Sequence, residues 1–194
     1  MKYGLPLCVR SSFNNNPGTL IGPMETNLEE PLVSGLSHDL GQARVNIRGL
    51  PGSPESLSAA LAPLAQDDIS VDFITQNVGV DGQMTISFTL DAKLLDQATA
   101  SLRRGLVGLA PAALSIQIDR DLAKVTAVGI GMRTHAGVAY RFFQSLTREN
   151  IPIHLALSTE VKVSCLVPAC DCQRALQVLH REFFERDGAV AADV

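Results

Sequence analysis

The residues of this chain whose types and spacing suit binding chemistry lie at two glycine-containing turns. The first turn, "GLPGSPESL", covers residues 49–57, and the second, "GMRTHAGVAYR", covers residues 131–141. A stretch with helical spacing follows each turn, and the first turn of a helix has unpaired backbone N–H groups and a partial positive charge. A free carboxylate is a natural ligand for such groups, which in the second turn lie near Val138 and Ala139. The alternative interpretation is that these glycines only allow the chain to turn.

The cysteines do not have the spacing of a metal site. Zinc sites usually combine C-x2-C pairs with a second pair or with nearby histidines. Here Cys170 and Cys172 are separated by one residue, His180 follows eight positions later, and there is no second pair. We therefore expect no metal ion, and in a chain of this length without a secretory signal we expect no disulfide framework. Cys165 alternates with valines along a predicted strand, so we expect it to be a small core residue.

Composition excludes several classes of function. The chain has 194 residues, of which 46% are hydrophobic and 19% charged, and its formal net charge is −4. These values are typical of a globular protein with a substantial core. Without a basic excess or any tryptophan, nucleic-acid binding is not expected. No apolar run approaches the roughly 20 residues needed to span a bilayer, and the first residues lack a signal-peptide core, so we expect a cytoplasmic protein without membrane contact.

An internal repeat organises the elements that carry the two turns. Residues 43–50, "ARVNIRGL", resemble residues 123–130, "AKVTAVGI", and the period is therefore about 80 residues. The same series of patterns follows each stretch: a helix, a strand, another strand and a second helix. In the first repeat these are predicted at 53–68, 69–78, 84–90 and 93–106, and in the second at 135–150, 151–159, 161–167 and 172–184. A closing strand is predicted at 112–119.

This order of elements predicts the fold class. Strand, helix, two strands, helix and closing strand is the split βαβ, ferredoxin-like pattern, in which an antiparallel sheet carries helices on one face. We therefore predict an α+β protein with two ferredoxin-like (βαββαβ) domains. The strand-like stretch "PLVSGL" at 31–36 has no counterpart in the first repeat. We expect it to complete the sheet of the second repeat, so that the first domain is inserted in the second.

Several stretches together resemble the C-terminal part of aspartate kinase. They are "KYGLPLCVRSSFNNNPGTLI", "SVDFITQNVGVDGQMTISFTL", "KVTAVGIGMRTHAGVAYRFFQSL" and "STEVKVSCLV", and the resemblance extends from Lys2 to about Phe184. In that family a kinase domain is followed by two ACT domains, which are small ferredoxin-like modules that bind amino acids. The resemblance implies a kinase-domain tail at 1–22, a first ACT domain at 41–118, a second made of 30–40 plus 119–184, and a flexible tail at 185–194.

The resemblance also implies a function. Members of the family bind lysine, threonine or both where ACT domains of two chains meet, and this binding inhibits the pathway that makes aspartate-derived amino acids. The phosphate-binding and aspartate-binding motifs of the kinase lie upstream in the family and have no counterpart here, so we expect no phosphoryl transfer by this chain alone and no cofactor. The expected partners are lysine or threonine, a second copy of the chain, and an aspartate kinase catalytic subunit or domain.

By the same resemblance, two effector regions are expected. The first has Gln76 and Asn77 facing the ligand, backbone from Ser56 and Leu57, and an opposing wall made by Asn150 and Ile153 of the second repeat. The second region resembles a lysine pocket made of Asp72, Val138, Ala139, Thr159 and Glu160. In physical terms, backbone N–H groups at a helix start take the carboxylate of the ligand, and a carboxylate such as Asp72 takes an ammonium group.

The sequence departs from the family pattern at the first region. Pro54-Glu55 stands where the family usually has Pro-Gly, which places a negative side chain at the helix start. Gly52 stands where the family has Asp, and Pro152 stands where it has Asn; proline donates no backbone hydrogen bond. The alternative function is therefore an assembly or dimerisation domain of an aspartate kinase whose effector sites are lost.

Overall fold

The computed structural model describes residues 7–10, 19–21, 33–107, 114–129 and 137–185. The chain divides into two units, residues 1–30 and residues 31–194. In the first unit, β1 (Leu7–Val9) pairs antiparallel with β2 (Thr19–Ile21). The kinase-domain tail predicted for 1–22 stays a prediction. Of the flexible tail predicted for 185–194, residues 186–194 lie outside the described residues.

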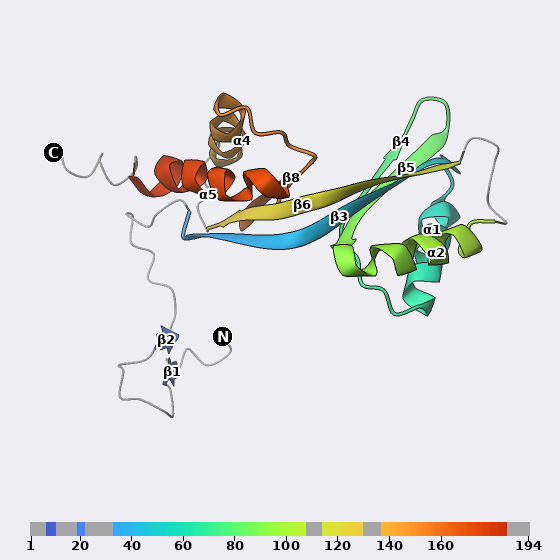
Figure 1. The fold of residues 1–194 in the computed structure, drawn as a ribbon, viewed down its shortest axis with the longest axis horizontal. Coiled ribbons are helices and arrows are strands. Elements are labelled where there is room, and N and C mark those ends of the chain that lie inside the picture. The colour runs from blue at the N-terminus through green and yellow to red at the C-terminus, as the bar shows by residue number, and fades with distance from the viewer. Residues whose placement is uncertain (1–6, 11–18, 22–32, 108–113, 130–136, 186–194) are drawn as a thin grey trace. The chain divides into compact units, whose positions relative to one another are not determined.

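One six-stranded sheet organises the second unit, in the order β4-β5-β3-β6-β8-β7, and every pairing in it is antiparallel. Its strands are β3 (Gly35–Pro51), β4 (Asp72–Val78), β5 (Gln83–Asp91), β6 (Ser115–Val128), β7 (Leu155–Ser158) and β8 (Lys162–Pro168). The α-helices are α1 (Pro54–Gln66), α2 (Leu95–Gly105), α4 (Val138–Arg148) and α5 (Cys172–His180). Short helical segments flank these: η1 (Ala92–Leu94), η2 (Ala169–Asp171) and η3 (Arg181–Glu185). Figure 1 shows one pair of α-helices at each end of the long strands β3 and β6.

Each repeat has its own hydrophobic core. In the first repeat, alternate residues of β3 and β5 pack against α1 and α2, with Ile47, Phe88 and Leu102 fully buried. In the second repeat, β6 and β8 pack against α4 and α5, with Phe142 and Cys165 fully buried. The burial of Cys165 confirms the expectation from its alternation with valines. The period of two along the strands and of 3.6 along the helices is the physical origin of both cores.

The two repeats share their central strands. We expected a closing strand at 112–119 and a separate strand from 123, but β6 runs through both segments. Its first part pairs with the second half of β3, and its second part, Lys124–Val128, pairs with Gly35–Asp39. Gly41, with φ 73°, and Asp121, with φ 56°, lie where each strand passes from one repeat to the other. Irregular residues of this kind let a strand change the side of the sheet to which its side chains point, without ending the strand.

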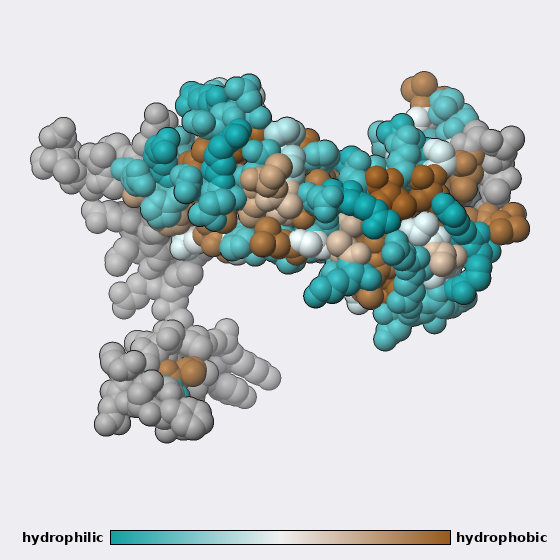
Figure 2. Space-filling view, viewed as in Figure 1, coloured by the Kyte–Doolittle hydropathy of each residue, from teal (hydrophilic) through white to brown (hydrophobic). Residues whose placement is uncertain are grey.

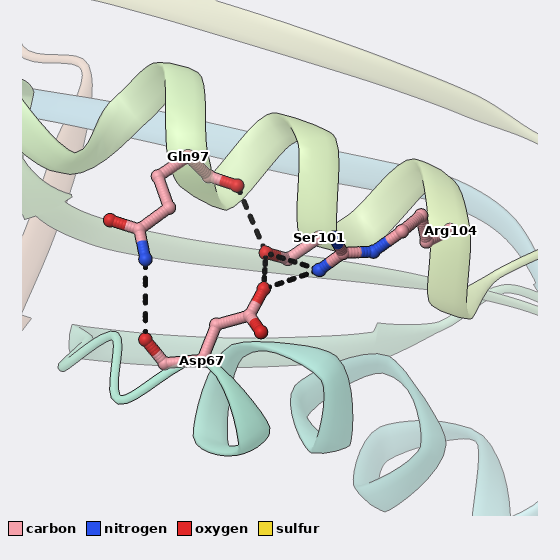
Figure 3. Close-up of polar contacts among 4 residues, drawn as sticks. All are labelled: Asp67, Gln97, Ser101 and Arg104. Atoms are coloured by element: carbon pink, nitrogen blue, oxygen red, sulfur yellow. Dashed lines mark hydrogen bonds and ion pairs between the residues drawn. The ribbon is translucent and has the colours of Figure 1, made fainter.

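Helices α1 and α2 are held together by a polar cluster at the end of α1 (Figure 3). Asp67, which follows α1, accepts hydrogen bonds from Ser101 and from Arg104, the latter at 2.5 Å. Its backbone carbonyl accepts from Gln97 at 3.3 Å. The hydrogen bond from Ser101, aided by Arg104, lowers the pKa of Asp67 despite the opposing effect of desolvation. This cluster fixes the end of α1 on the surface of α2.

Apolar side chains reach the surface along the edge strand β4. Ile74 and Val78 of β4 are 45% and 46% exposed, and Val80 in the turn to β5 is fully exposed. Figure 2 shows a small apolar area at the tip of the β4–β5 hairpin. An edge strand with unpaired backbone groups and apolar side chains is suited to contact with another chain.

Candidate functional site

The first predicted region begins at the start of α1. Ser53 is the N-cap residue in an extended conformation, and Pro54 occupies the first helical position, where its missing N–H costs nothing. The backbone N–H of Ser56 donates to the carbonyl of Ser53 at 3.1 Å, and their hydroxyls lie 3.2 Å apart. Ser56 is buried, and Leu57 is half-buried against the first core. The start of α1 is therefore a tightly built turn.

Glu55 places its own negative charge at this helix start. Its side chain is exposed, and its pKa is lowered mainly by a hydrogen bond from its own backbone N–H and then by one from the Ser53 hydroxyl. These are the kinds of donors that a free carboxylate would use at a helix N-terminus. Glu55 thus competes with an incoming anion at the first region.

The β4–β5 hairpin returns to the same end of the first repeat. The N–H of Gly52 donates to the carbonyl of Gly82 at 2.8 Å, and this links the turn before α1 to the hairpin. A side chain at Gly52 would place its Cβ 2.6 Å from that carbonyl, so this close contact requires glycine. Gln76 and Asn77 lie exposed on β4 near the hairpin. The first-repeat residues of the first predicted region therefore share one end of the first repeat.

The second repeat has glycines at the end of a strand and at the start of a helix. The N–H of Gly129, which follows β6, donates to the carbonyl of Val161 at 3.0 Å and so joins the end of β6 to the β7–β8 turn. Gly137, with φ 113°, is the N-cap residue of α4, and this backbone angle favours glycine. Val138 is buried and Ala139 is half-buried at the first turn of the helix.

The β7–β8 turn belongs to this same end of the second repeat. Thr159 and Glu160 are exposed in the turn. The N–H of Thr159 closes the turn by donating to the carbonyl of Lys162 at 2.8 Å. The N–H of Lys162 returns a hydrogen bond to the Thr159 hydroxyl at 3.2 Å. Four of the five residues predicted for the second region, those other than Asp72, are therefore placed by the helix start and the hairpin at one end of the repeat.

Asp72 is placed elsewhere, at the beginning of β4. Its carboxylate forms an ion pair with Lys124 of β6 at 2.7 Å and accepts the N–H of Phe73 at 2.9 Å. Burial alone would raise the pKa of Asp72, but the hydrogen bonds from Lys124 and Phe73 and the Lys124 charge outweigh it, so the pKa is lowered. Among the described residues, no hydrogen bond or ion pair joins Asp72 to the other residues of the second region. Its place in that pocket stays a prediction.

Asn150 and Ile153 lie beyond the end of α4. Asn150 has φ 52° and donates its N–H to the carbonyl of Thr147 at 2.9 Å, which ends the helix. Ile153 is partly buried against the second core. Within the described part of one chain, neither makes a hydrogen bond to the first region, so their role as its opposing wall stays a prediction.

Sequence reasoning missed a pair of basic residues that connect the repeats. Arg44 and Lys124 occupy the same position in "ARVNIRGL" and "AKVTAVGI". Arg44 binds Asp119 at 2.6 Å and the backbone carbonyl of His154 at the approach to β7. Lys124 binds Asp39 at 3.5 Å and Asp72 at the start of β4. The available signal was a basic residue at matching positions of the repeat.

The described residues lack two kinds of feature. No group of three or more His, Cys, Asp and Glu side chains in the described ranges is placed to hold a metal ion. No helix in the same ranges is both long and apolar enough to cross a membrane.

A family model for the ACT domain matches residues 125–183, which is the larger part of the second repeat. An aspartate kinase of Stutzerimonas stutzeri is 37% identical over 183 residues, and an aspartokinase of Helicobacter pylori is 34% identical. These matches cover 94% and 92% of this chain but 44% of each relative, so the chain spans less than half the length of these relatives.

Solved structures give the same result. The crystal structure of aspartokinase alpha and beta subunits contains a chain that is 37% identical, with a TM-score of 0.71, covering 78% of this chain and 98% of that one. The ligand-free regulatory subunit of aspartate kinase from Thermus thermophilus is 27% identical, with a TM-score of 0.72 and coverage of 78% and 99%. The fold is therefore that of tandem ACT domains, the first inserted in the second, as the sequence predicted. The chain belongs to the aspartate kinase family and corresponds to its regulatory ACT region.

Proposed function

We propose that this chain senses lysine, threonine or both where ACT domains of two copies meet, and that binding inhibits an aspartate kinase catalytic subunit or domain. The observation that carries the proposal is the start of α1 beside the β4–β5 hairpin, joined by the Gly52–Gly82 hydrogen bond; in the second repeat the Gly129–Val161 hydrogen bond joins the end of β6 to the β7–β8 turn. Backbone N–H groups at such a helix start suit the carboxylate of a free amino acid. Escherichia coli aspartokinase III, which is 25% identical with a TM-score of 0.69, has been solved in complex with lysine and aspartate.

The proposed assembly is a homodimer in the cytoplasm. Its support is the exposed apolar side chains of the edge strand β4, with Ile74 and Val78 about half exposed. Effector binding between two copies would stabilise one packing of the dimer and so shift the enzyme toward its inhibited state. Catalysis of phosphoryl transfer is assigned in this proposal to the catalytic partner and not to this chain.

A thermal-shift screen over the twenty amino acids tests sensing. Lysine or threonine at 100 times its dissociation constant is expected to stabilise the chain by about 2.7 kcal/mol, because it binds only the folded state. Replacing Gln76 and Asn77 together by alanine is expected to remove any shift due to the first region. Gln83→Ala, in an exposed residue of the neighbouring strand, is the matched control and should keep the shift.

A screen in which no amino acid raises the melting temperature of the folded chain would contradict the proposal. Isothermal calorimetry with the same two amino acids then gives the number of sites per chain. Light scattering with and without the ligand reports whether binding stabilises the dimer, which the proposal requires.

The alternative function, an assembly domain with lost effector sites, is favoured by one observation. Glu55 places a carboxylate at the start of α1, where the hydrogen bonds from its own N–H and from Ser53 lower its pKa. If this charge blocks the first region, Glu55→Gly should create amino-acid binding that calorimetry does not detect in the unmodified chain. Binding in the unmodified chain that Glu55→Gly does not change would contradict the alternative.

A further inference from the structure

We propose that Asp39, Asp72 and the ring of Phe73 form a binding site for a primary ammonium group, and that Lys124 of the same chain fills it. Lys124 is thereby a specificity-determining residue, which keeps the side-chain ammonium of a free lysine away from Asp72. The part of this inference that concerns free lysine rests on the proposed function. The ammonium site itself does not.

The contacts of the Lys124 ammonium match this chemistry. Its Nζ lies 2.7 Å from Asp72, 3.5 Å from Asp39 and 5.5 Å from the centre of the Phe73 ring. Two carboxylates and an aromatic face are the groups that recognise an ammonium ion, through charge-assisted hydrogen bonds and a cation–π contact. The Lys124 side chain is only 22% exposed, so water screens these contacts less than at an open surface.

The backbone at Phe73 is also strained. Its φ of 31° is rare for an aromatic residue, and the pairing of β4 with β5 shifts register between Asp72 and Thr75. This conformation allows the Phe73 ring to lie against Lys124 while Asp72 accepts the Phe73 N–H. Strain of this kind persists where the surrounding structure imposes it, and it is concentrated at binding sites.

The equivalent basic residue of the first repeat, Arg44, has different partners. Arg44 is held by Asp119 and by the backbone carbonyl of His154, so one carboxylate and a carbonyl replace the two carboxylates around Lys124. A tethered ammonium competes with a free one at a high effective concentration. A free lysine therefore reaches Asp72 only in the fraction of molecules whose Lys124 has moved away, and its apparent affinity falls by that fraction.

The first experiment tests the ammonium site without any amino acid. Lys124→Ala removes the internal ammonium, and n-propylammonium chloride should replace it. At several times its dissociation constant the salt should raise the melting temperature of this variant by about 2–4 °C more than sodium chloride of equal concentration. The unmodified chain and Lys93→Ala, which loses an exposed charge elsewhere, should respond equally to both salts.

Two results would overturn the ammonium site. One is an equal response of Lys124→Ala to both salts. The other is the same extra stabilisation in the double variant Lys124→Ala/Asp72→Asn, which lacks the central carboxylate. Should Lys124→Ala not fold, Lys124→Ser with the same salts gives the same comparison.

The second experiment tests selectivity. In Lys124→Met, which keeps the aliphatic stem, calorimetry should show lysine binding about five-fold tighter than in the unmodified chain, because an ion pair worth roughly 1 kcal/mol no longer competes. The affinity for threonine, whose side chain has no ammonium group, should change by less than the affinity for lysine. An unchanged ratio of the two affinities would overturn the selectivity. Absence of all amino-acid binding in both proteins would instead contradict the proposed function, and the propylammonium experiment would still decide the ammonium site.

Discussion

At the scale of residues, the most informative pair is Arg44 and Lys124. Each stands at the same position of its repeat and makes its polar contacts with elements at the border of the other repeat. Exposed ion pairs contribute little to stability, but both of these side chains are largely covered, at 18% and 22% exposure. These two ion pairs therefore contribute more to joining the repeats than fully exposed ion pairs would.

Cys165 gives a prediction at the residue scale. Burial, with a smaller contribution from nearby Cys172, raises the pKa of its thiol from 9.0 to about 12. Between these values the unfolded chain releases this proton and the folded chain keeps it, so stability should fall as pH rises above 9. The slope is up to about 1.4 kcal/mol per pH unit from this thiol.

Urea unfolding at several pH values from 8 to 10.5 measures this slope. Cys165→Ala should flatten it, whereas Cys170→Ala, in an exposed cysteine, should not. A thiol reagent should modify Cys170 in the native protein and leave Cys165 unmodified. Equal labelling rates for the two thiols would show that Cys165 is not buried in solution.

At the scale of elements, the packing of α1 on α2 depends on a glycine at the end of α2. A Cβ at Gly105 would lie 2.0 Å from Cγ of Pro63, whose ring is buried inside α1. The proline ring is rigid and has little freedom to move aside. The two helices therefore approach each other closely at this point, and the Asp67 cluster shown in Figure 3 joins the same two helices.

Gly105→Ala tests this contact, because two effects have opposite signs. Helix propensity alone predicts a gain of roughly 1 kcal/mol when alanine replaces glycine inside a helix. Overpacking predicts a loss of about 1–3 kcal/mol, and we expect the loss to prevail. Chemical denaturation gives the sign, and Gly35→Ala, where a Cβ meets no described atom within 4 Å, is the control. A stabilised Gly105→Ala would refute the close contact.

At the scale of the whole second unit, the shared strands β3 and β6 connect the two cores. Each strand passes through both repeats, so neither repeat has a complete sheet without a segment next to the other. We therefore expect the two repeats to unfold as one cooperative unit, as small domains usually do. Ligand binding to one repeat should then stabilise the other repeat as well.

Phe142→Ala tests this cooperativity. Removing a fully buried ring from the second core should cost about 3–5 kcal/mol. If the repeats unfold together, hydrogen exchange of the β5 amides in the first repeat should accelerate as well as exchange in β8. Tyr140→Ala, in an exposed residue of the same helix, should change exchange little in either strand. Faster exchange confined to the second repeat would mean that the repeats unfold independently.

The sequence by itself determined the fold class, the two cores and the family. Alternation along strands and the 3.6-residue period along helices depend only on neighbouring residues, so Cys165 was placed correctly inside. The glycine turns before α1 and α4 were equally local features. The resemblance of several stretches to aspartate kinase also indicated the family before any coordinates, and the relatives confirm it.

Only the tertiary structure decided how the repeats are joined and where the charges of the candidate regions lie. The continuity of β3 and β6 and the pairing of Lys124 with Asp72 connect residues far apart in sequence. Periodicity carries no information on such pairs, because it reports which face a residue lies on and not which distant residue it meets. The role of Asp72 as a ligand of a free ammonium came from the family resemblance and stays a prediction, whereas its ion pair with Lys124 is visible only in the fold.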